Sequence, residues 1–157
     1  MYIYIFDLDD TLLHVTYQKY SDIKPDLELN KLLNNINSPK YIFTNAIKTH
    51  SDKSLHKLKI SQHFLKTYSR DTIPDMKPNI NSYKYVERDI MIDFVSLDYI
   101  LEFENTIIFF DDRLENLKSA KLCGWNTVFI GNENMRFNYK FIDLSFNNIY
   151  DALNYFI

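Results

Sequence analysis

The feature that most constrains this chain is an apolar run near its start that ends in a group of carboxylates. Residues 2–6 are all aromatic or aliphatic, and residues 7–11 read Asp-Leu-Asp-Asp-Thr. Such a run is typical of a buried β-strand. Because side chains alternate along a strand, we expect Asp7 and Asp9 on the same side. Neighbouring carboxylates repel one another, so a cation is expected among them, and Mg²⁺ is the candidate because hard cations take oxygen ligands.

The length and composition indicate one folded domain, residues 1–157. With 46% hydrophobic residues the chain can bury a sizeable core. The net charge of −3 gives no general attraction to nucleic acid or to an anionic membrane, although nucleic acid stays open as a partner. The single cysteine, Cys123, rules out an intramolecular disulfide and fits a reducing compartment, so we expect a cytoplasmic protein. No apolar run approaches the length of a membrane span, and no signal peptide is expected.

Apolar runs alternate with helix signals along the rest of the chain. Further strands are expected at Tyr41–Phe43, Phe64–Ser69, Thr106–Phe110 and Thr127–Ile130, with a short strand at Phe141–Leu144 in the tail. Helices are expected after Pro25, from Ser51 or Asp52, from the turn Met76–Asn79 to about Arg88, over Asp93–Leu101, over Leu114–Cys123, and from Asn147. This alternation predicts the α/β class with a mainly parallel sheet.

Polar residues directly follow three of the predicted strands. The carboxyl ends of parallel strands lie at one edge of a sheet, which is where ligands bind in α/β proteins. We therefore expect three clusters to meet in space. They are Asp7 with Asp9, Thr44 with Asn45, and Asp111 with Asp112.

These residue types suit the hydrolysis of a phosphomonoester. A carboxylate can attack phosphorus, and a second carboxylate can protonate the leaving oxygen and then activate water. Asp7 is the candidate nucleophile and Asp9 the candidate acid and base. Asp111 would hold Mg²⁺ together with Asp7. Thr44 and Asn45 would bind the phosphate, and Lys77 would balance its charge.

Four segments in order resemble the motifs of the haloacid dehalogenase (HAD) superfamily of phosphohydrolases. FDLDDTL is similar to the first motif, at the end of strand one, and IFTNA to the second, a Thr ending strand two. MKPN resembles the third, a Lys at a helix start. FFDDRLENLKSAKLCGWNTVFIG resembles the fourth, an acidic pair followed by a helix, a Gly and a strand. The resemblance covers residues 2–131, and the four motifs together are far more specific than any one of them.

The resemblance implies a fold, a metal site and a covalent intermediate. It implies a Rossmann-like sheet of five strands in the order 5-4-1-2-3. It implies Mg²⁺ bound by Asp7, by the backbone oxygen of Asp9 and by Asp111, and an aspartyl-phosphate on Asp7. Asp112 would either bind the metal through water or orient Lys77.

The sequence departs from the family in its cap. Relatives of the nucleotidase-like and phosphoglycolate-phosphatase-like branch, which this chain looks closest to, usually carry a cap domain. Here residues 12–40 leave room only for a flap and one short helix, so the cap is expected to be reduced or absent. Members of the family without a cap tend to form oligomers over their sites or to take bulky substrates. Whether residues 12–24 close over the site is open, as is the role of Asp10, where relatives more often have Asn, Gly or Glu.

Simpler explanations exist for several of these residues. An acidic pair after a strand can cap a helix or lie in a solvated loop, which applies most to Asp10 and Asp112. Thr44 and Asn45 are also common in turns. Arg113 and Asn116 can be read as residues that cap or line a helix. The four histidines show no metal-ligand spacing and are expected at the surface. They are His14, His50, His56 and His63.

The sequence thus predicts a Mg²⁺-dependent phosphomonoester hydrolase that acts on a small phosphorylated metabolite or nucleotide. One alternative is a phosphatase for a macromolecule, either a phosphoprotein or a nucleic-acid end, and the other is a binding protein with this fold that has lost turnover. Homo-oligomers are compatible with either activity.

Overall fold

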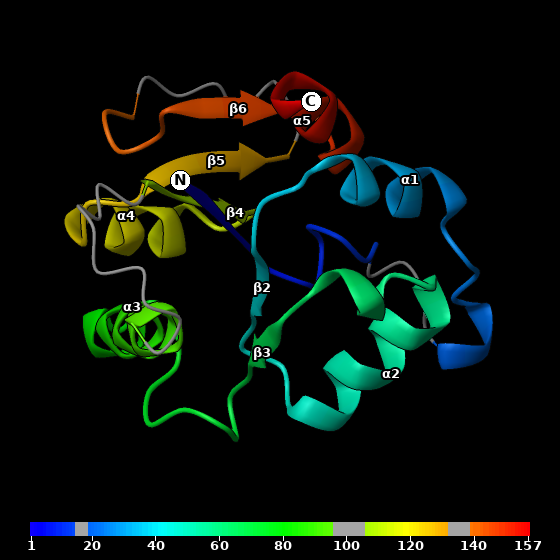
Figure 1. Cartoon of the computed structure of the whole chain (residues 1–157), viewed down its shortest axis with the longest axis horizontal. Coiled ribbons are helices and arrows are strands. Elements are labelled where there is room, and N and C mark those ends of the chain that lie inside the picture. Colours follow the sequence, from blue (N-terminus) through cyan, green and yellow to red (C-terminus); the bar gives the residue numbers. More distant parts are fainter. Residues whose placement is uncertain (15–18, 96–105, 132–138) are drawn as a thin grey trace.

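The computed structural model describes residues 1–14, 19–95, 106–131 and 139–157. Within these ranges the chain forms a six-stranded sheet in the order β3-β2-β1-β4-β5-β6 (Figure 1). Every pair of neighbouring strands is parallel. The strands are β1 (Tyr2–Phe6), β2 (Lys40–Phe43), β3 (Lys66–Tyr68), β4 (Thr106–Asp111), β5 (Asn126–Ile130) and β6 (Leu144–Phe146).

Helices cover both faces of the sheet (Figure 1). The side chains of α1, α2 and α5 pack into one hydrophobic cluster, and those of α3 and α4 pack into another. The helices are η1 (Tyr20–Asp22), α1 (Leu27–Asn35), α2 (Lys48–Leu58), η2 (Ser61–His63), α3 (Ile80–Val95), α4 (Leu114–Leu122) and α5 (Ile149–Phe156).

The central strand β1 contributes side chains to both hydrophobic clusters. Ile3 and Ile5 belong to the cluster under α3 and α4, whereas Tyr4 and Phe6 belong to the cluster under α1, α2 and α5. Alternate side chains of a strand point to opposite faces, so a continuous apolar run fits a strand that is buried on both sides. The centre of the sheet is therefore rigidly held at the position where Asp7 follows.

The strand register brings the acidic residues together. Phe6 of β1 pairs with Phe110 of β4, and the backbone N–H of Asp7 donates to the carbonyl of Phe110 at 2.8 Å. Asp7 and Asp111 come next on the two strands, and both lie on the α3 and α4 side by alternation. The register alone thus places these two carboxylates side by side.

The predicted class and the predicted strand order are confirmed, but the predicted count of five strands is wrong. The sixth strand, β6, pairs with β5 from Leu144 onward. It therefore begins three residues after the start of the predicted strand Phe141–Leu144. Phe141 packs against the cluster under α3 and α4, and the Asp143 carboxylate accepts the backbone N–H of Thr127 at 2.8 Å. These contacts hold residues 141–143 outside the ladder.

Helix α2 begins earlier than the sequence predicts. Neither Ser51 nor Asp52 caps it, since α2 starts at Lys48. The backbone N–H of Lys48 donates instead to the carboxylate of Asp71 at 2.8 Å, and Ser51 is buried one turn in. The early start puts His50 in the first turn of α2, close to the end of β2.

Two predicted segments lie partly outside the described residues. The helix predicted over Asp93–Leu101 overlaps the end of α3 at Val95, and its residues 96–101 are outside. The described part of the predicted flap, residues 12–24, includes η1, while residues 15–18 are outside. Among the described helices, all are too short or too polar to cross a membrane.

Candidate active site

A cavity of about 460 Å³ opens at the carboxyl ends of β1, β2 and β4. It holds most of the residues that the sequence singles out, brought together from four separate segments. Its lining residues are Asp7, Asp9, Asp10, Thr44, Asn45, Ala46, His50, Lys77, Asp112, Arg113 and Asn116.

The floor of this cavity is a buried lysine between two carboxylates. The ammonium Nζ of Lys77 lies 2.7 Å from Oδ1 of Asp7 and 2.7 Å from Oδ2 of Asp111. The side chains of Lys77, Asp7 and Asp111 are 1%, 10% and 0% exposed. The same Nζ lies 5.2 Å from the ring centroids of Phe43 and Phe109, within reach of a cation–π interaction. We call Asp7, Lys77 and Asp111 the buried centre.

Residues at the start of α4 hold Asp111 in place. The side-chain amide of Asn116 donates to both oxygens of Asp111, at 3.1 and 3.0 Å, and the backbone N–H of Arg113 donates to Oδ1 at 2.8 Å. Three hydrogen bonds to one buried carboxylate fix its orientation. Asn116 therefore does more than line the helix, whereas the exposed guanidinium of Arg113 lies 3.7 Å from Glu115.

The electrostatics of the cavity floor favour a further cation. Burial raises the pKa of Asp7 to about 7 despite the neighbouring Lys77, and burial with the charge of Asp111 raises the pKa of Asp112 to about 6. Burial alone would lower the pKa of Lys77, but the charges of Asp111 and Asp7 raise it above its ordinary value. Lys77 thus stays charged, and its single positive charge does not balance the negative charge of the neighbouring carboxylates.

The geometry offers a place for that cation. Asp7, Asp111 and Asp112 each present a carboxylate oxygen, and the three oxygens lie within 4.8 Å of one another. An all-oxygen donor set is what Mg²⁺ requires. The residues therefore fit the predicted metal. Asp112 joins Asp7 and Asp111 in this cluster, whereas Oδ1 of Asp9 lies 2.9 Å from Nε2 of His50.

The two residues after β2 have different surroundings. Thr44 is buried, and its Oγ1 accepts the backbone N–H of Ala46 at 3.1 Å. The Asn45 side chain makes two hydrogen bonds to the backbone of Lys77: its amide donates to the carbonyl at 2.8 Å, and its oxygen accepts the N–H at 2.9 Å. Both residues line the cavity, and Asn45 also connects the segment that holds Lys77 to the end of β2.

His50, which the sequence places at the surface, has a side chain that is 28% exposed and lines the cavity. Its Nε2 is 2.9 Å from Oδ1 of Asp9, and its Nδ1 is 2.8 Å from the hydroxyl of Tyr20. His50 and Asp9 are 41 positions apart in the chain, and no motif or periodicity links them. We call Asp9, His50 and Tyr20 the outer arm of the site.

The backbone explains why an acidic residue is tolerated at position 10. Asp10 has φ of 61°, in the left-handed region that Asn, Asp and Gly enter most readily. The carbonyl of Leu8 accepts the N–H groups of Thr11, Leu12 and Leu13, which closes the turn after β1. The turn itself thus favours a short polar side chain at this position.

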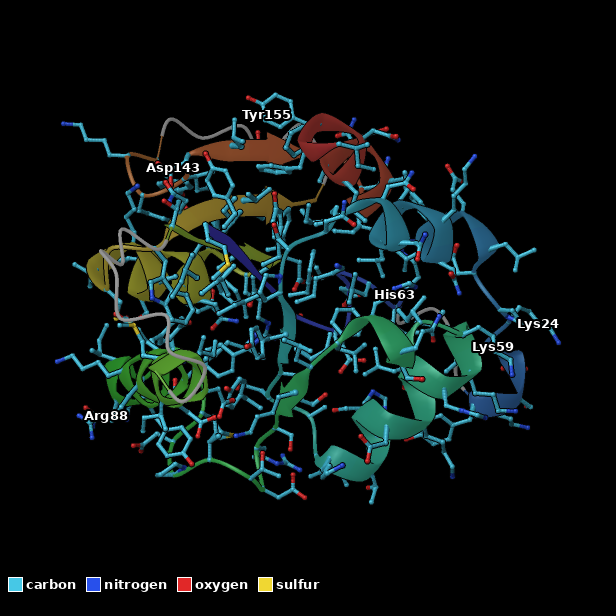
Figure 2. All side chains as sticks on the ribbon, in the orientation of Figure 1. Lys24, Lys59, His63, Arg88, Asp143 and Tyr155 are labelled. Carbon is cyan, nitrogen blue, oxygen red and sulfur yellow. The ribbon has the colours of Figure 1, made fainter. Side chains whose placement is uncertain are left out.

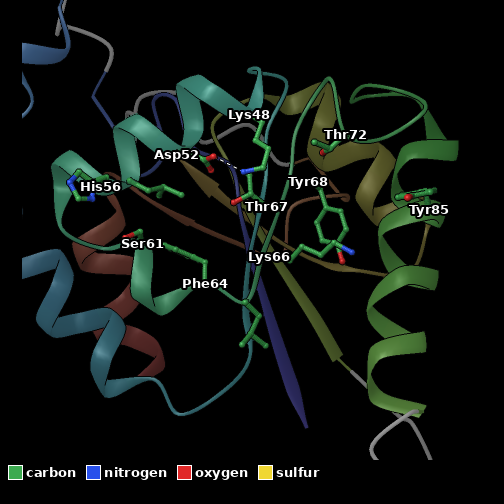
Figure 3. A pocket seen from close by; sticks show the side chains of 12 residues that line it. Lys48, Asp52, His56, Ser61, Phe64, Lys66, Thr67, Tyr68, Thr72 and Tyr85 are labelled. Atoms are coloured by element: carbon green, nitrogen blue, oxygen red, sulfur yellow. Dashed lines mark hydrogen bonds and ion pairs between the residues drawn. The ribbon is translucent and has the colours of Figure 1, made fainter.

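A second cavity, of about 630 Å³, lies between α2, β3 and α3 (Figure 3). Asp52 is the one acidic residue in its lining, and an ion pair of 2.5 Å joins it to Lys48. This cavity therefore lacks the paired carboxylates that phosphoryl transfer needs, and the candidate active site is the cavity at the strand ends.

Comparison with known proteins finds likeness in structure alone. No family model matches the chain, and no curated protein matches it either. Among solved structures, a HAD-superfamily hydrolase from Ehrlichia chaffeensis is 15% identical, with a TM-score of 0.60 over 98% of this chain and 94% of that one.

Larger proteins match over part of their length. A predicted phosphoglycolate phosphatase from Haemophilus somnus is 17% identical, with a TM-score of 0.64 over 84% of this chain and 57% of that one. A protein from Bacillus subtilis named as a HAD-hydrolase, solved with magnesium bound, is 18% identical, with a TM-score of 0.61 over 80% and 53%. Dehalogenases also match. The chain spans little more than half the length of these larger relatives, and it has the fold of the HAD-superfamily hydrolases, the family that its four motifs resemble.

Proposed function

We propose that this chain is a Mg²⁺-dependent phosphomonoester hydrolase of the HAD superfamily that works through an aspartyl-phosphate on Asp7. The observation that carries the proposal is the buried centre, in which Lys77 lies 2.7 Å from both Asp7 and Asp111 at the floor of an open cavity. A buried cation beside a carboxylate nucleophile supports attack on a phosphoryl group that itself carries close to two negative charges.

The first half-reaction transfers the phosphoryl group to the protein. An oxygen of Asp7 attacks phosphorus, the bond between phosphorus and the leaving oxygen breaks, and Asp9 gives its proton to that oxygen. Asp9 is suited to this role because its side chain is 35% exposed and lines the cavity. A proton donor at this position makes departure possible for leaving groups that are strong bases.

The second half-reaction releases inorganic phosphate. Water loses a proton to Asp9 and attacks phosphorus, and the bond between phosphorus and the Asp7 oxygen breaks. Asp7 returns to its carboxylate form, and Asp9 holds a proton for the next turnover. Lys77 stays within hydrogen-bond distance of Asp7, where it balances the charge on the attacking oxygen.

Asp7, Asp111 and Asp112 would hold Mg²⁺, with the backbone oxygen of Asp9 as the further predicted ligand. When bound, the ion supplies positive charge toward the phosphoryl oxygens. This carboxylate cluster also favours phosphate esters over haloacids, since displacement of a halide from a singly charged acid needs neither a second cation nor a proton donor.

For the substrate we propose a small phosphorylated metabolite or a nucleotide. The cavity volume of about 460 Å³ falls within the range of small-molecule sites, roughly 300–1,000 Å³. A panel of nucleoside monophosphates, sugar phosphates and phosphopeptides tests this choice. Preference for the peptides would favour the macromolecular alternative instead.

The activity itself is tested by release of phosphate from p-nitrophenyl phosphate, with Mg²⁺ and with EDTA. We expect metal-dependent hydrolysis by the wild type and none by Asp7→Asn. The matched control is Asp52→Asn, which makes the same chemical change at an exposed site on α2 and should keep full activity. Normal turnover by Asp7→Asn would disprove the mechanism.

A further inference from the structure

The outer arm joins three segments that are far apart in the sequence. Asp9 follows β1, His50 lies in the first turn of α2, and Tyr20 lies in η1. The hydroxyl of Tyr20 is 2.8 Å from Nδ1 of His50, and Nε2 of His50 is 2.9 Å from Oδ1 of Asp9. The proposed mechanism gives a role to Asp9 but none to His50 or Tyr20.

The direction of the hydrogen bond between His50 and Asp9 follows from which of their atoms can donate a hydrogen. An ionised Asp9 has only acceptors, so Nε2 of His50 must donate to Oδ1. A neutral imidazole then has Nδ1 free to accept the Tyr20 hydroxyl, and a protonated imidazole donates at both nitrogens. In either state of the ring, His50 donates to Oδ1 of an ionised Asp9.

The hydrogen bond from His50 also gives the two carboxylate oxygens of Asp9 different surroundings. When Asp9 carries a proton, Oδ1 can still accept from His50 while the proton sits on Oδ2. Within the described part of the chain, His50 is the side chain that bonds the Asp9 carboxylate, and it does so at Oδ1 alone. Oδ2 is thus left as the oxygen that exchanges a proton with the substrate.

Tyr20 is itself held on both sides. Its ring packs against the hydrophobic cluster under α1, α2 and α5. The Nζ of Lys53 lies 4.6 Å from its ring centroid, and the His50 ring lies 5.6 Å from it. The arm is therefore anchored to the core at one end and reaches Asp9 at the other.

We propose that His50, held by Tyr20, is a positioning residue that fixes the side chain of Asp9 for proton transfer to the leaving group. The inference rests on the proposed function and adds a role for the segment that stands in place of a cap. That segment, through Tyr20 and His50, orients Asp9, the residue that acts as both acid and base in the reaction. At 35% exposure the Asp9 side chain is only partly covered, so packing leaves it some freedom and the hydrogen bond from His50 fixes its orientation.

The test compares two substrates that differ in how much they need a proton. p-Nitrophenyl phosphate has a leaving group that departs as an anion, whereas glycerol 2-phosphate has an alkoxide that must be protonated. We expect His50→Ala to lower kcat on glycerol 2-phosphate by about 10- to 100-fold and kcat on p-nitrophenyl phosphate by less than about threefold, with both KM values nearly unchanged.

Two further variants separate positioning from packing. His50→Gln retains an N–H donor at similar reach and should restore most of the lost rate, and Tyr20→Phe should give a smaller loss of about two- to fivefold on glycerol 2-phosphate alone. His56→Ala is the matched control, because His56 is an exposed histidine of the same helix and should behave as the wild type. Equal losses on both substrates, or no loss in His50→Ala, would overturn the proposal.

A measurement without substrate distinguishes failure of this inference from failure of the proposed function. In ¹⁵N-labelled protein, we expect the ring nitrogen Nε2 of His50 to show the chemical shift of a protonated, hydrogen-bonded nitrogen, and Asp9→Asn and Tyr20→Phe to change the shifts of the His50 ring. Neither variant should change the ring nitrogens of His56. A His50 ring that neither variant affects would refute the arm whatever the enzyme hydrolyses, and a His50 ring that responds to both without phosphatase activity would refute the proposed function alone.

Discussion

The two halves of the site differ in how they hold their carboxylates. In the buried centre, side chains no more than 10% exposed meet at 2.7 Å. Asp7 and Asp111 lie at the ends of paired strands, and Lys77 lies in the turn before α3. In the outer arm, Asp9 and His50 are 35% and 28% exposed and meet at 2.9 Å, on segments joined by hydrogen bonds. Charge in the centre is shielded from water and interacts strongly, whereas charge in the arm is solvated.

This difference predicts that substitutions in the two halves will have different effects on stability and activity. A group removed from the buried centre leaves a buried charge without its partner, so the fold and the activity should both suffer. A group removed from the outer arm leaves its partners accessible to water, so stability should change little while the rate falls. The experiments below test that division from its strongest effect to its weakest.

The largest effect on stability is expected from Lys77→Met. The change keeps the apolar volume of the side chain but leaves Asp7 and Asp111 buried without their shared cation. The free energy of unfolding, measured by urea denaturation in EDTA, should fall by about 3–5 kcal/mol.

The matched control is Lys121→Met. Lys121 also contacts a carboxylate closely, at 2.6 Å from Asp143, beside the start of β6 (Figure 2), but its side chain is 36% exposed. Its loss should cost less than about 1 kcal/mol. Equal costs for the two lysines would show that burial is not what makes the loss of Lys77 costly.

Mg²⁺ should stabilise the protein through the buried centre. At a concentration 100 times its dissociation constant, a ligand that binds only the folded state raises the free energy of unfolding by about 2.7 kcal/mol. Asp111→Asn keeps the shape of the side chain and removes a charged ligand, so it should abolish most of that gain. A denaturation series with and without Mg²⁺ measures the gain, with Asp89→Asn as the control, since Asp89 pairs with Lys66 away from the cavity.

Without metal, the stability should fall as the pH rises toward neutrality. The pKa of Asp7 is raised by burial from 3.8 to about 7, so the folded protein holds a proton that the unfolded chain loses. Between about pH 4 and 7 the folded state therefore binds more protons, and its advantage is lost as the pH rises through 7, by at most about 1.4 kcal/mol per pH unit. Thermal unfolding in EDTA should show this slope in the wild type and a flatter one in Asp7→Asn.

The sequence predicts the buried centre far better than the outer arm, for a physical reason. Asp7 and Asp111 follow unbroken apolar runs, and parallel pairing of those runs places the two carboxylates side by side. The contact of His50 with Asp9 depends on where α2 begins, and that start is set by Asp71, a residue far from the predicted caps. Tyr20 lies in a short 3-10 turn without any periodic signal. The pairing of the strand ends could be predicted from the apolar runs and Lys77 from its motif, although it lies in a turn before α3, whereas nothing in the sequence indicated the contact between His50 and Asp9.

The smallest effect is expected at the edge of the outer arm, from Lys53→Met. Its Nζ lies 4.6 Å from the ring centroid of Tyr20, and at an exposed site such a cation–π contact contributes about 0.5–1 kcal/mol. We expect a stability loss of that size and less than about a twofold change in kcat, because His50 and Tyr20 keep their hydrogen bond. Lys57→Met, one turn further along α2, is the control and should change neither quantity. A loss in Lys53→Met as large as that in Lys77→Met would mean that the outer arm is part of the stabilising core, and the division of the site into a buried half and a solvated half would be wrong.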